Sequence, residues 1–396
     1  MNAVAFPEVR LAKGRQKRVR AGHPWIFSNE LQMSPETKSL TPGTVVAFAD
    51  AGGGSVGTGF FNPHSLIAGR ILRRDGGPVD GALLESRLRA ALFLRDRLFG
   101  RPYYRMVHSE ADGLPGLIVD RYGDFLCVQI NAAGMALMQD TLIDALRAVT
   151  GSSAILLKND NSTRRLEGLE DEVRWIGPEP PSPHILTENG VEFRLDLGSG
   201  QKTGWFFDQA ANRALVASLA SGARVLDLYC YLGGFGLSAA KAGAESVTLV
   251  DRSQAALDLV SQTAEANGLD GLCDIRKASA FDEAERLAAA GETFDIVVAD
   301  PPAFVKSRRD QKSGARGYRK LARLSASLVA PGGLLFTASC SHHMPLDQFA
   351  EQVRRGIADT GREARILSTT GAGPDHPVHP HLPESAYLKA QLLQLD

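Results

Sequence analysis

Two segments in the second half of the chain carry side chains that could act on a planar ring. Residues 296–304 are an apolar run that ends in Asp300 and two prolines, which place a carboxylate beside a rigid turn that lacks backbone donors. Residues 334–341 are a second apolar run, and it ends in Cys340 between two serines. If the two runs are neighbouring parallel strands, the thiol and the carboxylate meet at one edge of the sheet.

A thiol beside a carboxylate suits methylation of carbon 5 of a pyrimidine. That carbon is a poor nucleophile, so a thiolate first adds to carbon 6, carbon 5 takes the methyl group, a base removes the carbon-5 proton and the thiolate leaves. We expect Cys340 to be the nucleophile and Asp300 to hydrogen-bond a ring nitrogen and stabilise the charge of the adduct. Cys230 and Cys273 are interpreted as buried small apolar residues, the usual role of a lone cysteine.

The base that removes the proton is sought near the C-terminus. Residues 375–384 hold three histidines and two acids in a proline-rich segment with no helical or strand pattern. The hypothesis is that Glu384 or His379 closes the site and serves as the base. A metal site is the rival interpretation, but one short loop supplies no distant ligand, so no metal is expected.

A methyl-donor site is predicted in residues 225–236. An apolar strand there ends in Asp227 and a glycine-rich turn leads into a helix. A dinucleotide fingerprint aims a helix at a pyrophosphate, whereas here an acid precedes the turn. S-adenosylmethionine has no phosphate and carries cationic sulfonium and ammonium groups, which a carboxylate attracts. A turn that binds no nucleotide and an NAD site are the alternatives.

The next strand ends in Asp251, which is placed to accept hydrogen bonds from ribose hydroxyls. The residues expected to line the cofactor site are Asp227, Tyr229, Gly233, Gly236, Asp251, Arg252 and Asp300.

The elements that must position these residues form an α/β pattern. Short apolar strands alternate with helices after residue 183, which predicts a doubly wound parallel sheet; the expected strands are 224–228, 246–250, 273–277, 294–299 and 334–338. Residues 177–183 are rich in proline and predict a linker. Before it, strands at 44–49, 56–60 and 67–72 predict a small β-barrel. A middle α+β region follows, with helices at 83–99 and 136–149, a hairpin at 117–130 and a strand at 154–158. The expected domains are residues 1–76, 77–183 and 184–396.

Composition narrows the class of protein. The 396 residues are 44% hydrophobic and 22% charged, as in a globular protein, and no run approaches the roughly 18 apolar residues of a membrane span. Residues 1–8 lack the order of a signal peptide, so a cytoplasmic protein without a membrane partner is expected. The four cysteines are scattered, which argues against a disulfide framework.

The net charge of −1 gives no general attraction to nucleic acid, yet residues 9–20 are basic without an acid. A solvated edge is the alternative to a phosphate-binding face there. The candidate RNA contacts are Lys13, Arg15, Lys17, Arg18 and Arg20.

The chain as a whole resembles the PUA-domain-containing 23S ribosomal RNA 5-methylcytosine methyltransferases. The motifs that carry the resemblance are residues 22–30, 112–120, 202–209, 227–236, 300–304, 339–341 and 375–377. The resemblance implies an N-terminal PUA-like domain that binds RNA, a small middle domain and a C-terminal Rossmann-like class I methyltransferase fold. It also implies 23S ribosomal RNA or a large-subunit assembly intermediate as partner, and a possible homodimer.

By this resemblance Cys340 matches the nucleophile, and Asp208, Gln209 and Arg213 help to close the cofactor pocket. Ser279 stands where the family often has an acid against the adenine amino group; it can still accept a hydrogen bond, and Asp282 is a weaker substitute.

Three other functions remain open at this stage. A 5-methyluracil enzyme would use the same thiol chemistry, and an amino-group methyltransferase would need no thiol. A non-catalytic RNA-binding or ribosome-assembly factor with a relic cofactor fold is the third. The acids Asp227, Asp251 and Asp300 argue against the last of these.

Overall fold

The computed structural model describes residues 6–198, 200 and 203–396, so most of the N-terminal segment 1–8 and Lys202 of the 202–209 motif lie outside the described residues. The chain divides into two compact units. The first comprises Met1–Pro181, Leu197–Trp205 and Pro374–Pro383, and the second comprises Ser182–Asp196, Phe206–Gly373 and Glu384–Asp396. The first boundary falls within the proline-rich segment 177–183.

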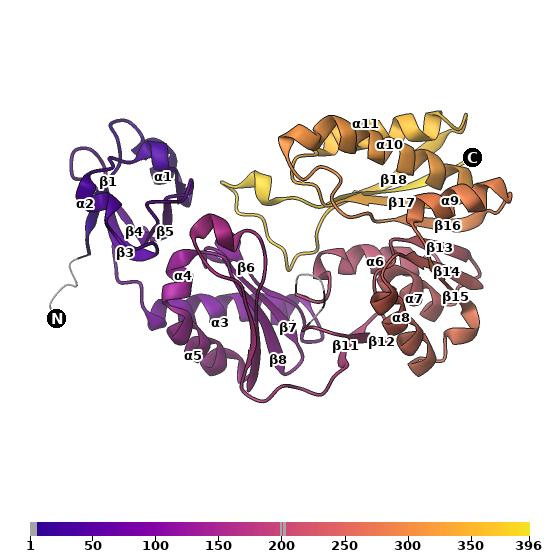
Figure 1. Ribbon diagram of the computed structural model, residues 1–396, viewed down its shortest axis with the longest axis horizontal. Coiled ribbons are helices and arrows are strands. Elements are labelled where there is room, and N and C mark those ends of the chain that lie inside the picture. Colours follow the sequence, from indigo (N-terminus) through magenta and orange to yellow (C-terminus); the bar gives the residue numbers. More distant parts are fainter. Residues whose placement is uncertain (1–5, 199, 201–202) are drawn as a thin grey trace. The chain divides into compact units, whose positions relative to one another are not determined.

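The N-terminal part of the first unit is a five-stranded sheet in the order β1-β3-β4-β5-β2 (Figure 1). Its strands are β1 (Glu8–Arg10), β2 (Trp25–Ile26), β3 (Thr44–Ala49), β4 (Ser55–Phe61) and β5 (Gly69–Arg73). Two short helices, α1 (Gln16–Arg20) and α2 (Pro35–Lys38), accompany them. The three strands expected from the sequence are present. The sheet also gains β1, which pairs in parallel with β3, and β2, which is too short to leave a periodic signal.

A second five-stranded sheet, in the order β10-β9-β8-β7-β6, forms the rest of the first unit. Its strands are β6 (Tyr103–His108), β7 (Leu117–Tyr122), β8 (Phe125–Ile130), β9 (Ala154–Asn159) and β10 (Glu172–Ile176). Its helices are α3 (Gly81–Leu98), α4 (Ala133–Leu137) and α5 (Gln139–Thr150). Helix α3 begins where the Asp80 side chain accepts the Leu83 amide, and it buries Leu84 and Leu88. The single helix expected at 136–149 is therefore two helices that meet at Met138.

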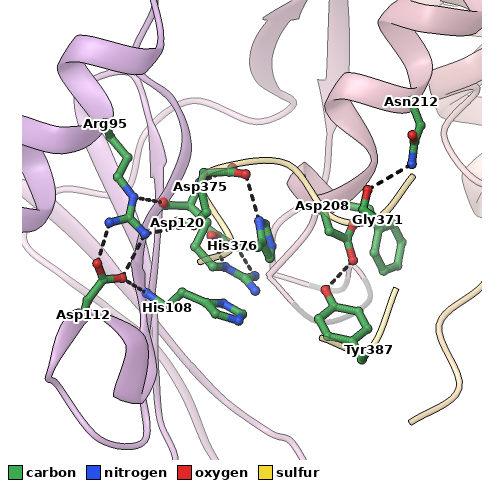
Figure 2. A network of polar contacts seen from close by, with 12 residues as sticks. Arg95, His108, Asp112, Asp120, Asp208, Asn212, Gly371, Asp375, His376 and Tyr387 are labelled. Carbon is green, nitrogen blue, oxygen red and sulfur yellow. Dashed lines mark hydrogen bonds and ion pairs between the residues drawn. The ribbon is translucent and has the colours of Figure 1, made fainter. Parts of the chain in front are cut away.

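A buried arginine holds the first unit to its distant segment 374–383, as the labelled residues of Figure 2 show. Arg95 on α3 is fully buried and makes a bidentate ion pair with Asp112, at 2.5 and 2.8 Å. Its guanidinium also donates to the Asp375 carbonyl at 2.9 Å, and the Asp375 carboxylate accepts the Arg105 amide at 3.0 Å. The Asp375 carboxylate is further paired with His376 at 2.9 Å. The Asp-His-Pro motif at 375–377 is thus part of the packing of this unit.

The second unit is built on a seven-stranded sheet in the order β15-β14-β13-β16-β17-β19-β18. Its strands are β13 (Arg224–Leu228), β14 (Ser246–Asp251), β15 (Cys273–Lys277), β16 (Phe294–Ala299), β17 (Val329–Ser339), β18 (Ala364–Thr370) and β19 (Lys389–Leu395). The helices are α6 (Ala210–Ala217), α7 (Gly234–Lys241), α8 (Gln254–Ala266), α9 (Ala280–Ala289), α10 (Gln311–Leu328) and α11 (Leu346–Ala358). Helices α10 and α11 pack side by side against one face of the sheet (Figure 1). A hairpin of β11 (His184–Glu188) and β12 (Val191–Leu195) precedes the sheet.

The doubly wound fold predicted for this part is confirmed, with one difference in the direction of its strands. The five strands predicted from the sequence are parallel, but β19 runs antiparallel to both β17 and β18. Strand β18 is an exposed edge and β19 holds Lys389 and two glutamines, so neither has the uninterrupted apolar run typical of a buried parallel strand.

We expect Arg95→Met to lower the free energy of unfolding of the first unit by roughly 3–5 kcal/mol, because it leaves the Asp112 carboxylate buried and unpaired. Denaturant unfolding followed by tryptophan fluorescence measures this, since Trp25, Trp175 and Trp205 all lie in that unit. Arg89→Met on the exposed face of the same helix, where Arg89 meets Glu85 at 3.4 Å, should cost less than about 1 kcal/mol. Equal effects of the two substitutions would contradict the structural role of Arg95.

Candidate active site at the carboxyl ends of the sheet

Four strands of the second unit end at one edge of the sheet and deliver the candidate residues there. Asp227 lies in register with Leu249 of β14 and Val298 of β16, and Asp251 ends β14. Asp300 follows Ala299, which pairs with Thr337 of β17, and Cys340 follows the end of β17. The edge that the sequence predicted therefore exists, and it brings three carboxylates and one thiol together.

Asp227 is the most deeply buried of these acids, with 1% of its surface exposed. Its carboxylate accepts the Gly236 amide at 2.8 Å. The pKa of Asp227 is raised to about 8, chiefly by burial and also by the negative charges of Asp300 and Asp251, against the opposing effects of the Gly236 hydrogen bond and the Arg213 charge. The three carboxylates thus act on one another electrostatically, and a cation at this edge would stabilise all of them.

The turn after β13 is held in a backbone conformation that is uncommon for side-chain-bearing residues. Tyr229 and Tyr231 have φ of +66° and +50°, and Gly233 at the start of α7 has φ of +76°. The Asp251 carboxylate fixes this turn because it accepts the Tyr231 amide at 3.0 Å. Asp251 therefore shapes the turn in addition to any contact that it makes with a ribose.

Gly236 is needed for packing. A Cβ atom at this position would lie 2.7 Å from Leu249 Cδ2 of β14, so glycine is what allows α7 to approach the sheet. The approach brings the Gly236 amide to Asp227. Gly236 thus serves the close contact between helix and strand, and its expected place in the cofactor site stays a prediction.

Cys340 is half-buried and lies between two serines that are held from α10. The Tyr318 hydroxyl is 2.8 Å from both Ser339 Oγ and Ser341 Oγ. The Val305 amide, just beyond the Asp-Pro-Pro turn, donates to Ser341 Oγ at 3.1 Å. All of these groups are buried, so the turn that carries Cys340 is tied at once to α10 and to the loop that follows Asp300.

Lys389 is a functional candidate that the sequence argument missed. It pairs with Ser339 in the sheet register and donates from Nζ to the Ser341 and Tyr387 carbonyls at 2.6 and 2.7 Å. Burial lowers the pKa of Lys389 to about 8, and a negative charge on the Cys340 thiol raises it. The ammonium is thus within electrostatic reach of the thiol. The available signal was a single lysine at the start of residues 389–395, where apolar residues are interrupted by two glutamines.

The residues expected to close the cofactor pocket lie before and within α6. Asp208 accepts the Tyr387 hydroxyl at 2.5 Å, and Gln209 accepts the Asn212 amide at 2.6 Å; Asp208 and Asn212 are labelled in Figure 2. Arg213 is 3% exposed and forms a bidentate ion pair with Glu188 of β11. Arg213 also donates to the Phe206 carbonyl at 3.0 Å, so its guanidinium is bound to groups of the protein itself.

Comparison with known proteins places the chain among methyltransferases. Residues 98–394 match the S-adenosylmethionine-dependent methyltransferase family and residues 9–74 match a PUA-like domain. The chain is 37% identical over 392 residues to the ribosomal RNA large subunit methyltransferase I of Aeromonas salmonicida, covering 98% of each chain. The protein of that name from Klebsiella pneumoniae is 35% identical, with 97% of each chain covered.

The chain belongs to the ribosomal RNA large subunit methyltransferase I family. Its fold is shared with a solved Streptococcus mutans protein described as a SAM-dependent methyltransferase, with a TM-score of 0.82, 22% sequence identity and 98% and 100% of the two chains covered. The predictions of an S-adenosylmethionine-dependent methyltransferase and of S-adenosylmethionine as its cofactor are therefore confirmed.

The edge of this methyltransferase fits its cofactor on structural grounds. A cluster of carboxylates with one buried member whose pKa is raised suits a ligand that carries sulfonium and ammonium charges. Tyr229 and the exposed Arg252 lie beside the turn, where the Arg252 charge lowers the pKa of Tyr229 against the larger effect of burial. Ser279 precedes α9 with its side chain not engaged in capping that helix, and Asp282 is exposed.

The predicted RNA contacts and the candidate bases come from other parts of the chain than the four strand ends. Lys13, Arg15 and Lys17 are exposed, whereas Arg18 pairs with Glu30 at 2.5 Å and Arg20 with Asp50 at 2.7 Å. Glu384 is exposed in a short 3-10 turn of the second unit. His379 groups with the first unit, where burial lowers its pKa. No described group of three or more His, Cys, Asp or Glu side chains could hold a metal ion.

We expect the affinity for S-adenosylmethionine to rise with pH between about pH 6 and about pH 8 and then to level off. Below its raised pKa Asp227 is neutral, a cationic ligand favours the carboxylate, and binding must therefore release a proton. Calorimetry in buffers of different ionisation enthalpy counts that proton. Asp227→Asn should abolish the pH dependence, and Asp258→Asn on the exposed face of α8 should preserve it. A flat wild-type affinity over this range would contradict the role of Asp227.

We expect Lys389→Met to raise the pKa of the Cys340 thiol, because a neighbouring cation favours the thiolate. The effect should be largest below about pH 8, where Lys389 holds its proton. The rate of Cys340 alkylation by iodoacetamide as a function of pH, located by peptide mass spectrometry, measures it. Lys389→Arg keeps the charge and should stay closer to the wild-type profile. Identical profiles for wild type and Lys389→Met would show that the ammonium does not act on the thiol.

Proposed function

We propose that this methyltransferase transfers a methyl group to carbon 5 of a cytosine in large-subunit ribosomal RNA through a covalent adduct with Cys340. The observation that carries the proposal is the position of Cys340: it follows β17, next to the strand that ends in Asp300, within electrostatic reach of Lys389. The names of its relatives support large-subunit ribosomal RNA as the substrate.

The protein's own groups divide the reaction as follows. Cys340 Sγ bonds to carbon 6 of the ring as the carbon 5–carbon 6 double bond opens, while the Asp300 carboxyl, in its protonated form, donates a hydrogen bond to the ring nitrogen that gains electron density. Bound S-adenosylmethionine supplies the methyl group for carbon 5. A base then takes the carbon-5 proton, the double bond re-forms and the Cys340 thiolate leaves. We propose Glu384, which belongs to the same unit as Cys340, as this base; His379 is the alternative.

The three-domain division, at residues 1–76, 77–183 and 184–396, is part of the proposal, with the PUA-like domain binding RNA. Three exposed cations there are the best placed to meet phosphates, namely Lys13, Arg15 and Lys17. Arg18 and Arg20 would have to exchange a protein carboxylate for a phosphate. A cytoplasmic location and a homodimer remain predictions. Among the described residues no helix is both long and apolar enough to cross a membrane.

We expect Cys340→Ala to reduce methyl transfer from labelled S-adenosylmethionine to a large-subunit ribosomal RNA transcript by at least roughly 10³-fold. Nucleoside mass spectrometry identifies the product and separates 5-methylcytidine from 5-methyluridine. A transcript containing 5-fluorocytidine should trap the wild type as a covalent complex, because fluorine cannot leave as a proton. Cys340→Ala should form no such complex.

Cys273→Ala is the matched control, because Cys273 is also half-buried and burial raises its pKa to about 11. It should retain both activity and trapping. Full activity of Cys340→Ala would contradict methylation of carbon 5 and favour an amino-group methyltransferase, which needs no thiol. Unchanged turnover of Glu384→Gln would remove Glu384 as the base.

A further inference from the structure

The segment directly after the Asp-Pro-Pro turn is strongly basic. Between residues 306 and 323 the chain holds eight cationic residues and one acid, although the whole protein has a net charge of −1. The cations are Lys306, Arg308, Arg309, Lys312, Arg316, Arg319, Lys320 and Arg323. None of the described large apolar side chains in this segment is exposed, so its surface is polar and positive.

Five of these cations form what we call the basic face: Lys306, Arg308, Arg309, Lys312 and Arg316. All five are exposed, and none forms an ion pair with a carboxylate of the described residues. The carboxylate of the single acid, Asp310, accepts hydrogen bonds from the Ser307 amide and hydroxyl at 3.0 and 2.8 Å. By contrast, Arg319 pairs with Asp359 and Lys320 with Glu285. The charge of the basic face is therefore available to a ligand.

Helix α10 carries part of the basic face and also contacts the turn that holds Cys340. Lys312 and Arg316 are one helical turn apart on its exposed side, while Tyr318 on its buried side holds the two serines around Cys340. The Phe304 ring packs on the Tyr318 ring with centroids 4.8 Å apart and anchors the loop before Lys306. Lys306 is six residues beyond Asp300, so the two lie within roughly 20 Å even along a fully extended chain.

We propose that the basic face binds backbone phosphates of the RNA strand that carries the target nucleotide. This inference rests on the proposed function. A base that reacts at the sheet edge must be turned out of its stack, and cations next to that edge would hold the flanking phosphates in place. Three of the five are arginines, whose planar guanidinium group suits phosphate oxygens. We infer RNA and not a protein as the partner, because the basic face has exposed positive charge but no exposed large apolar side chain of the kind found at the centre of protein interfaces.

The test is the salt dependence of RNA binding by the full chain. A variant with Lys306→Gln, Arg309→Gln and Arg316→Gln is compared with wild type on a single-stranded oligoribonucleotide by fluorescence anisotropy. If each cation meets one phosphate, the slope of log affinity against log salt should become shallower by about 2. Affinity at low salt should fall, whereas calorimetric affinity for S-adenosylmethionine should be kept.

The control removes three exposed cations elsewhere in the same unit, by Lys241→Gln, Arg354→Gln and Arg355→Gln; Arg354 and Arg355 pair with Glu351 and so test exposed charge that already has a partner. It should keep the wild-type slope. An unchanged slope in the basic-face variant, or an equal loss of slope in the control, would overturn the inference. Neither result contradicts the proposed function, provided that the wild type methylates the transcript at cytosine. The methyl-transfer assay tests the proposed function independently of RNA binding.

Discussion

A buried carboxylate at the end of β13 is the constraint on which the candidate site depends. Asp227 is held by a single amide from α7 in the presence of two other carboxylates, and the cost of burying its charge appears as a raised pKa. Such an arrangement is unfavourable for folding alone and favourable for a cationic ligand. The glycine turn, the close packing of α7 and the position of Asp251 all maintain it.

The Cys340 thiol is positioned by contacts that do not involve Asp227. Ser339, Tyr318 and Ser341 fix the turn, and β19 brings Lys389 beside it. Because β19 runs antiparallel to β17, a lysine at its start can lie next to a cysteine at the end of its neighbour. The antiparallel strand is therefore part of the active site that we propose, because it places a buried cation next to the thiol.

The first unit shows a different use of buried charge. Arg95, Asp112 and the backbone of Asp375 satisfy one another, so the cost of desolvation is offset by bidentate geometry and hydrogen bonds to a carbonyl. The histidines at 376, 379 and 381, which the sequence offered as candidates for chemistry, group with this unit. The segment 374–383 that carries these histidines also packs on the first unit through Asp375.

The amino-acid sequence by itself determined the class of fold, the choice of a cationic cofactor, and the strands whose ends carry the candidate residues, namely Asp227, Asp251, Asp300 and Cys340. These follow from local patterns, because an apolar run sets a strand and the residue after it sets the chemistry of the edge. Only the tertiary structure decided what surrounds them. Tyr318 and Lys389 are 22 and 49 residues from Cys340 in the sequence, and their approach depends on how α10 and β19 pack. Whether a charge is paired or exposed, as for Arg18 and Lys306, is likewise a property of distant neighbours, which no local pattern encodes.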